Sequence, residues 1–261
     1  MNNYCEPSRE LSWRIWNYIS RVYQYSGMRV SEVGLTNHLV FDIVDFSSRN
    51  NDIVEVFAWH SEKESIQGAD IDLFIEQPGG GFQFYMLQAK VMNQKGRYSG
   101  IARWNTYAQY YKLIRAAGHK NAIPLYLLYN GATERSQLGA VEYGMAIAHA
   151  RSICDFRKRQ YDDDDNRKLF FDLLMQEALL KPFSDLFCQK GAPPFGTGPL
   201  LNLKEIHRGF PYRKVENSKR AERQQQQSEE NEKELQEQED SANRKGLAPC
   251  RIIIYQEGGN G

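Results

Sequence analysis

Hydrophobic residues are spaced in two ways along the first two thirds of the chain. In some segments they recur every three or four positions, as on one face of a helix, and in others they alternate or run continuously, as in strands. The helical spacing predicts helices at about 8–24, 31–45, 101–117, 136–160 and 166–181. The strand-like spacing predicts strands at 53–59, 68–76, 82–91 and 123–130. Elements in this order are typical of the α/β class, with a mixed central β-sheet flanked by helices.

Two local features predict how these elements begin and pair. Ser8 and Ser31 stand where the N-caps of the first two helices are expected. The turn QPGGG joins the second and third strands into a β-hairpin. A turn centred between positions 79 and 80 places position 70 opposite position 89, and a shift of one residue places it opposite position 90.

The C-terminal part of the chain differs in composition from the rest. The segment 217–245 is rich in Gln and Glu and nearly lacks large apolar residues, which predicts a charged linker or a frayed helix. The tail at 246–261 contains PCRIIIYQ, a short strand that we expect to return to the sheet edge. We therefore predict one folded domain at 1–216, with a helical C-terminal part.

Composition excludes several classes of protein. The chain is 41% hydrophobic and 12% aromatic, which is too rich in large apolar residues for a wholly disordered protein. No apolar run approaches the length of roughly 18 residues that a membrane span needs, so we expect no membrane partner. The cysteines are scattered singly, which argues against a zinc site or a disulfide framework and for reduced thiols in a cytoplasmic protein. They are Cys5, Cys154, Cys188 and Cys250.

Positive charge is concentrated in one stretch although the net charge is +0. No Asp or Glu occurs from Gln77 to Thr133, and Tyr and Trp residues alternate there with Lys and Arg. Cations hold phosphates and aromatic rings stack on bases, so this mixture favours DNA binding. The cations that we predict to contact DNA are Lys95, Arg97, Arg103, Lys112 and Arg115. The alternative is a solvated helix face with a few core aromatics.

The hairpin carries the strongest chemical signal. Asp70 and Asp72 share one face of its first strand, and Gln88 and Lys90 share one face of its second. Carboxylate oxygens, the Gln88 amide oxygen and the carbonyl of Ala89 suit a hard cation such as Mg²⁺, or Mn²⁺. The ammonium of Lys90 could orient an attacking water and offset charge that builds up on a phosphate. The alternative is that these are surface charges on a solvated sheet face.

The pattern G-A-D-(x)17-Q-A-K, preceded by a helical Glu, resembles the PD-(D/E)XK nuclease superfamily. The Gln replaces the usual acid, as in the Mrr-like Q-x-K variant. The resemblance covers roughly 28–130 and implies a restriction-endonuclease-like αβββαβ core. By position it implies that Glu32 is the helical acid, Asp70 the strand acid, Gln88 the variable metal ligand and Lys90 the lysine. Asp72 is a rival for the strand acid.

This resemblance implies a metal-dependent DNA endonuclease, with a role in prokaryotic anti-phage defence or restriction. A duplex cutter commonly needs two sites, so a homo-oligomer or a defence-system partner protein is expected. Two other interpretations stay open. One is a catalytically silent member that binds nucleic acid, since Gln removes a negative charge from the metal site. The other is a protein-interaction subunit of a defence complex, whose hairpin is only structural.

Overall fold

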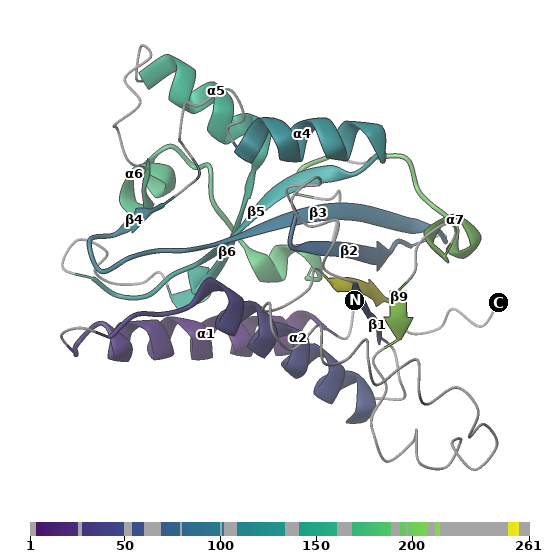
Figure 1. Ribbon diagram of the computed structural model, residues 1–261, viewed down its shortest axis with the longest axis horizontal. Helices are drawn as coiled ribbons and strands as arrows, with labels where there is room; N and C mark the ends of the chain where they lie inside the picture. Colours follow the sequence, from purple (N-terminus) through teal and green to yellow (C-terminus); the bar gives the residue numbers. More distant parts are fainter. Residues whose placement is uncertain are drawn as a thin grey trace, which may run out of the picture.

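A computed structural model shows how these segments are arranged (Figure 1). It describes residues 4–25, 28–49, 54–59, 69–78, 80–99, 101, 109–133, 141–160, 169–188, 194–196, 198–207, 212–214 and 250–255. The 217–245 segment and Arg103 lie outside these residues. No helix among the described residues is long and apolar enough to cross a membrane.

The centre of the molecule is an eight-stranded mixed sheet. In spatial order its strands are β8 (Lys181–Pro182), β6 (Met145–His149), β5 (Ile123–Tyr129), β3 (Phe82–Val91), β2 (Ile71–Glu76), β10 (Cys250–Ile254), β1 (Val54–Trp59) and β9 (Tyr212–Lys214). The pairs β3–β5 and β10–β2 are parallel, and the other pairs are antiparallel. A second, two-stranded sheet joins β4 (Arg97–Tyr98) to β7 (Leu169–Phe170). The predicted α/β class is confirmed.

Helices cover both faces of the large sheet (Figure 1). The helical elements are α1 (Cys5–Val22), α2 (Glu32–Arg49), α4 (Gln109–His119), α5 (Ala150–Gln160), α6 (Phe171–Gln176), α7 (Leu203–His207) and the 3-10 turns η2 (Val141–Tyr143) and η3 (Phe183–Leu186). Helices α1 and α2 form one hydrophobic core with alternate residues of the strands, and α4 and α5 form a second core on the opposite face. Strands β2, β3 and β5 are therefore buried on both faces, which explains their nearly continuous apolar runs.

Two predicted helices contain a strand. The segment expected as one helix at 136–160 forms η2, β6 and α5, and the segment expected at 166–181 forms β7 and α6. The residues of β6, MAIAH, have no strong strand preference of their own. They pair along the edge of β5, from Tyr129↔Met145 to Leu125↔His149, so tertiary pairing overrides local propensity there.

The C-terminal strand lies inside the sheet and not at its edge. Strand β10 inserts between β2 and β1, parallel to the former and antiparallel to the latter. Ile252, Ile253 and Ile254 are almost wholly buried, because neighbouring strands and helices cover both faces of the strand. The expectation of an edge strand was wrong. The continuous apolar run of this strand places hydrophobic side chains on both of its faces, which is typical of a strand inside a sheet.

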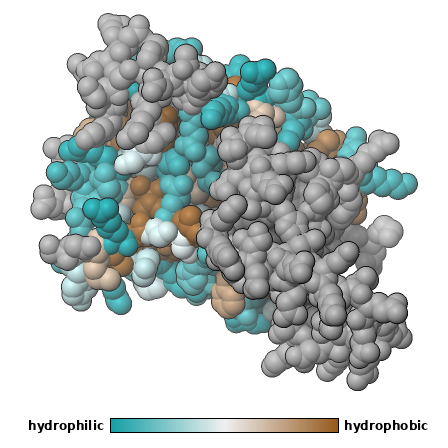
Figure 2. Space-filling view, viewed as in Figure 1, coloured by the Kyte–Doolittle hydropathy of each residue, from teal (hydrophilic) through white to brown (hydrophobic). Residues whose placement is uncertain are grey.

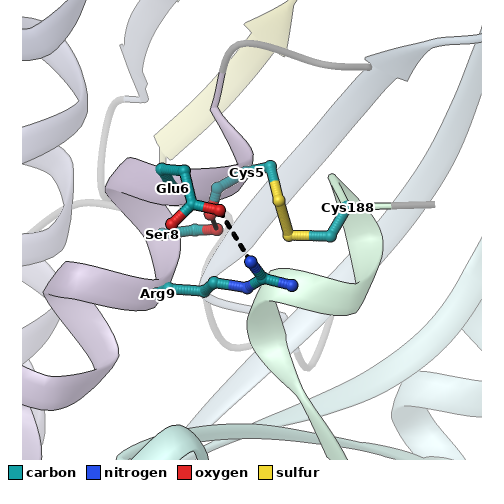
Figure 3. The surroundings of a disulfide bond; sticks show 5 residues. All are labelled: Cys5, Glu6, Ser8, Arg9 and Cys188. Carbon is teal, nitrogen blue, oxygen red and sulfur yellow. Dashed lines mark hydrogen bonds and ion pairs between the residues drawn. A yellow bond between two sulfur atoms is a disulfide. The ribbon is translucent and has the colours of Figure 1, made fainter.

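The prediction of reduced thiols is also wrong for two cysteines. Cys5, at the start of α1, and Cys188, just after η3, form a disulfide (Figure 3). The two residues are 183 positions apart, so only the packing of α1 against η3 brings them together. Cys154 on α5 is free and buried.

The two predicted N-caps have different outcomes. Ser8 lies within the first turns of α1, where its hydroxyl donates to the Cys5 carbonyl at 2.7 Å, because the helix begins earlier than its apolar spacing indicated. Ser31 accepts a hydrogen bond from the Gly34 backbone N–H at 3.3 Å, as expected of a cap of α2.

Candidate functional site

The β2–β3 hairpin has a register that differs from both predicted ones. Ile71 faces Leu87 and Glu76 faces Phe82, so position 70 comes opposite position 88. The turn holds Gly80 and Gly81 at positive φ, and its centre falls half a residue earlier than predicted. Position 70 therefore comes opposite Gln88, the first residue of the Q-A-K segment, and not opposite its second or third residue.

Asp70 sits immediately before β2, where the two strands stop pairing. Its backbone N–H donates to the Leu87 carbonyl at 2.8 Å. Its carboxylate oxygen Oδ2 accepts a hydrogen bond from the Ala89 backbone N–H at 2.7 Å and another from the Gln88 amide at 2.5 Å. The carboxylate thus accepts a backbone hydrogen bond that a further paired residue of the strand would otherwise accept. It is held in contact with the first two residues of the Q-A-K segment.

Glu32 and Lys90 form an ion pair at the same segment. The Lys90 Nζ donates to the two carboxylate oxygens of Glu32 at 3.1 and 3.3 Å. Lys90 is 8% exposed, whereas the side chain of Glu32 is 36% exposed, so one partner is buried and the other faces solvent. Glu32 is fixed at the start of α2, where Thr36 donates to its carbonyl and also contacts the hydroxyl of Tyr129.

The four residues expected at the site therefore form two pairs, Asp70 with Gln88 and Glu32 with Lys90, which meet the same short segment of β3. α2 supplies Glu32, the residue before β2 supplies Asp70, and β3 supplies Gln88 and Lys90. Glu32 and Lys90 are 58 positions apart in the sequence, so the fold alone unites them.

Asp72 belongs to a different cluster. Its carboxylate lies 3.6 Å from the Arg251 guanidinium on β10 and 3.8 Å from the Lys120 Nζ just after α4. Arg251 in turn donates to the Ile206 carbonyl and stacks 5.0 Å from the Phe74 ring. Burial lowers the pKa of Lys120, and the Asp72 charge only partly opposes that effect. The rival acid thus stabilises the β2–β10 contact, whereas Asp70 is the acid that accepts a hydrogen bond from Gln88.

The oxygen atoms around Asp70 are of the type that a hard cation binds. Among the described residues no three His, Cys, Asp or Glu side chains converge on one point, so a cation would need neutral oxygens as well as carboxylates. Gln88 and the carbonyl of Ala89 can supply such oxygens, since the Gln88 amide contacts the Asp70 carboxylate and lies 3.5 Å from the Ala89 carbonyl. The amide nitrogen of Gln88 points toward Asp70. For Asp70 and Gln88 to bind one cation, the amide group of Gln88 would have to turn over so that its oxygen points there instead.

The cations predicted to bind DNA are placed in two regions. Lys95 is exposed in the turn before β4, and Arg97 on β4 stacks over Phe170 at 5.2 Å. Lys112 and Arg115 are exposed on α4. Arg103 lies outside the described residues.

Tyr126, a buried residue beside the site, was not predicted from the sequence. Tyr126 on β5 pairs directly with Gln88, and its hydroxyl is buried with no hydrogen-bond partner among the described residues. Burial raises the pKa of Tyr126 above its ordinary value, and burial also raises the pKa of Tyr110 on α4 to about 12. The run IPLYLLYN contained the signal, because a Tyr within a continuous apolar strand places a hydroxyl inside the core.

Residues 4–259 match a family of unknown function, DUF6615, and the chain belongs to this family. No curated protein matches the sequence significantly.

Proposed function

We propose that the protein is a metal-dependent DNA endonuclease of the PD-(D/E)XK type, which acts in prokaryotic defence. The observation that supports this most is that two pairs, Asp70 with Gln88 and Glu32 with Lys90, adjoin consecutive positions at one end of β3. The order α2, β1, β2, β3, α4, β5 also agrees with the αβββαβ core that the resemblance implies. The insertion of β10 between β1 and β2 is a departure from a simple three-strand meander.

Each residue has a distinct task in this proposal. Asp70, Gln88 and the Ala89 carbonyl would hold Mg²⁺ or Mn²⁺, with Glu32 beside them. The metal ion would stabilise the charge that develops on the scissile phosphate. Lys90, held by Glu32 at 3.1 Å, would orient the attacking water. Its burial favours this task, because a desolvated ammonium acts more strongly on a neighbouring charge than one in water does.

The test is plasmid nicking by the purified protein with Mg²⁺, with Mn²⁺ and with EDTA. We expect nicking with either metal and none with EDTA. Lys90→Ala should abolish nicking and keep DNA affinity within a few-fold. The matched control is Lys120→Ala, since Lys120 also lies beside an aspartate but outside the site. Normal nicking by Lys90→Ala, or equal loss in both folded variants, would overturn the proposal.

The second candidate is a catalytically silent nucleic-acid-binding protein. The observation in its favour is that Asp70, Gln88, Glu32 and Lys90 already satisfy one another by hydrogen bonds. In that case DNA affinity is the same with Mg²⁺ and with EDTA, and no nicking occurs under either condition.

A further inference from the structure

We propose that the end of the α4–α5 layer next to the candidate site binds the phosphate backbone of a polynucleotide that runs past the site. This inference rests on the proposed function and names the surface that would hold its substrate. The surface consists of Tyr111, Lys112, Lys158 and Arg159, and we call it the basic end of the layer. Of these, Lys158 and Arg159 belong to α5, which no sequence pattern connects with DNA.

Strand direction places this end beside the site. Strands β3 and β5 are parallel, with Lys90 opposite Leu128 near their C-terminal ends. Helix α4 leads into the other end of β5 and packs back over it (Figure 1), so the N-terminal part of α4 lies toward the C-terminal ends of β3 and β5. Tyr111 and Lys112 are in that part.

The last turn of α5 reaches the same place. The Lys158 Nζ lies 5.9 Å from the centre of the Tyr111 ring, so the C-terminal end of α5 adjoins the N-terminal part of α4. β6 runs antiparallel to β5, and α5 follows β6 and turns back over the sheet, which agrees with this contact. Two helices far apart in sequence thus bring their cations together at the end of the sheet that carries Lys90.

The charge of this layer suits a polyanion. Lys112, Lys158 and Arg159 are exposed, and Asp155 is the sole acid within the sequences of α4 and α5. Hydrophilic side chains gather over α4 along the upper part of Figure 2. The acidic run at 162–165, which follows α5 in the sequence, lies outside the described residues.

A polynucleotide fits this end better than a small anion does. Three exposed cations from two helices lie at this end, Lys112, Lys158 and Arg159. Duplex DNA carries one negative charge per about 1.7 Å of its axis, so several neighbouring phosphates can contact these cations together. Tyr111 is 44% exposed between them and offers a ring face to a sugar or an unpaired base.

Cations in the last turn of α5 also stabilise that helix through its dipole, so a measurement of stability does not test the inference. The informative measurement is the salt dependence of DNA affinity, followed by fluorescence anisotropy of a labelled duplex in EDTA. The test variant is Lys158→Gln with Arg159→Gln. The control is Arg151→Gln with Lys204→Gln, which removes the same charge. Arg151 starts α5, and Lys204 follows the bridge of Leu201 to Phe82, so both lie toward the far end of β3.

We expect the test variant to bind more weakly and to lower the slope of log K against log salt by about 0.9 for each phosphate that it no longer neutralises. The control should keep the slope of the unaltered protein. An unchanged slope in the test variant, or an equal fall in both variants, overturns the inference. If the unaltered protein nicks DNA but the test variant binds normally, only this inference fails. If the unaltered protein binds no DNA and captures an acidic protein instead, this inference and the proposed function both fail.

Discussion

Asp70 and Asp72 are two positions apart, yet their carboxylates have different neighbours. Asp70 accepts hydrogen bonds from the Q-A-K segment at the end of the β2–β3 ladder. Asp72 is buried beside Arg251 and Lys120. Sequence periodicity places both on one face and cannot separate them. The separation comes from β10, whose Arg251 lies 3.6 Å from the carboxylate of the second aspartate.

This difference predicts opposite effects of two identical substitutions. Asp72→Asn should destabilise the protein by about 3–5 kcal/mol, because it leaves the buried Arg251 without its carboxylate. Asp70→Asn keeps an oxygen that can accept from the Ala89 N–H, so its stability should change little while nicking is abolished. Urea denaturation and plasmid nicking on both variants check this. A stable Asp72→Asn that no longer cuts DNA would make Asp72 the strand acid after all.

At the scale of elements, β10 is the strand on which the sheet most depends. It separates β1 from β2 and pairs with both. Ile253→Ala should lower the free energy of unfolding by about 2–5 kcal/mol, because it leaves a cavity between buried strands. Leu200→Ala, at a side chain that is 48% exposed, should change it by no more than about 0.5 kcal/mol. Equal denaturation midpoints for the two variants would mean that β10 does not occupy the sheet.

Elements that carry a local signal could be predicted from the sequence, and those that depend on distant partners could not. The hairpin, α2 and β5 follow from turn residues, periodicity and a continuous apolar run. The four candidate site residues are chosen from the motif, which needs only their order along the chain, and their role stays a prediction. The register of the hairpin, the strand β6 and the central place of β10 are set by pairing partners, which periodicity does not reveal.

At the scale of the whole molecule, the Cys5–Cys188 disulfide ties α1 to the segment after η3. It joins residues 183 positions apart, so it restricts the unfolded chain strongly. We expect reduction by dithiothreitol to lower the free energy of unfolding by about 2–4 kcal/mol. The Cys5→Ser, Cys188→Ser variant should show the lower stability from the start and no response to reductant. A reductant effect of equal size in both proteins would assign the change to another cause.

The position of β10 has a consequence for synthesis of the chain on the ribosome. Strands β1 and β2 leave the ribosome long before the strand that must fit between them. Until β10 emerges, Asp72 does not have Arg251 beside it. The edges of β1 and β2 that pair with β10 in the folded protein also await that strand. An unfinished or prematurely terminated chain therefore cannot assemble the complete sheet. For a protein whose proposed activity would damage DNA, this order of events delays the complete sheet beside the β2–β3 hairpin until β10 has been translated.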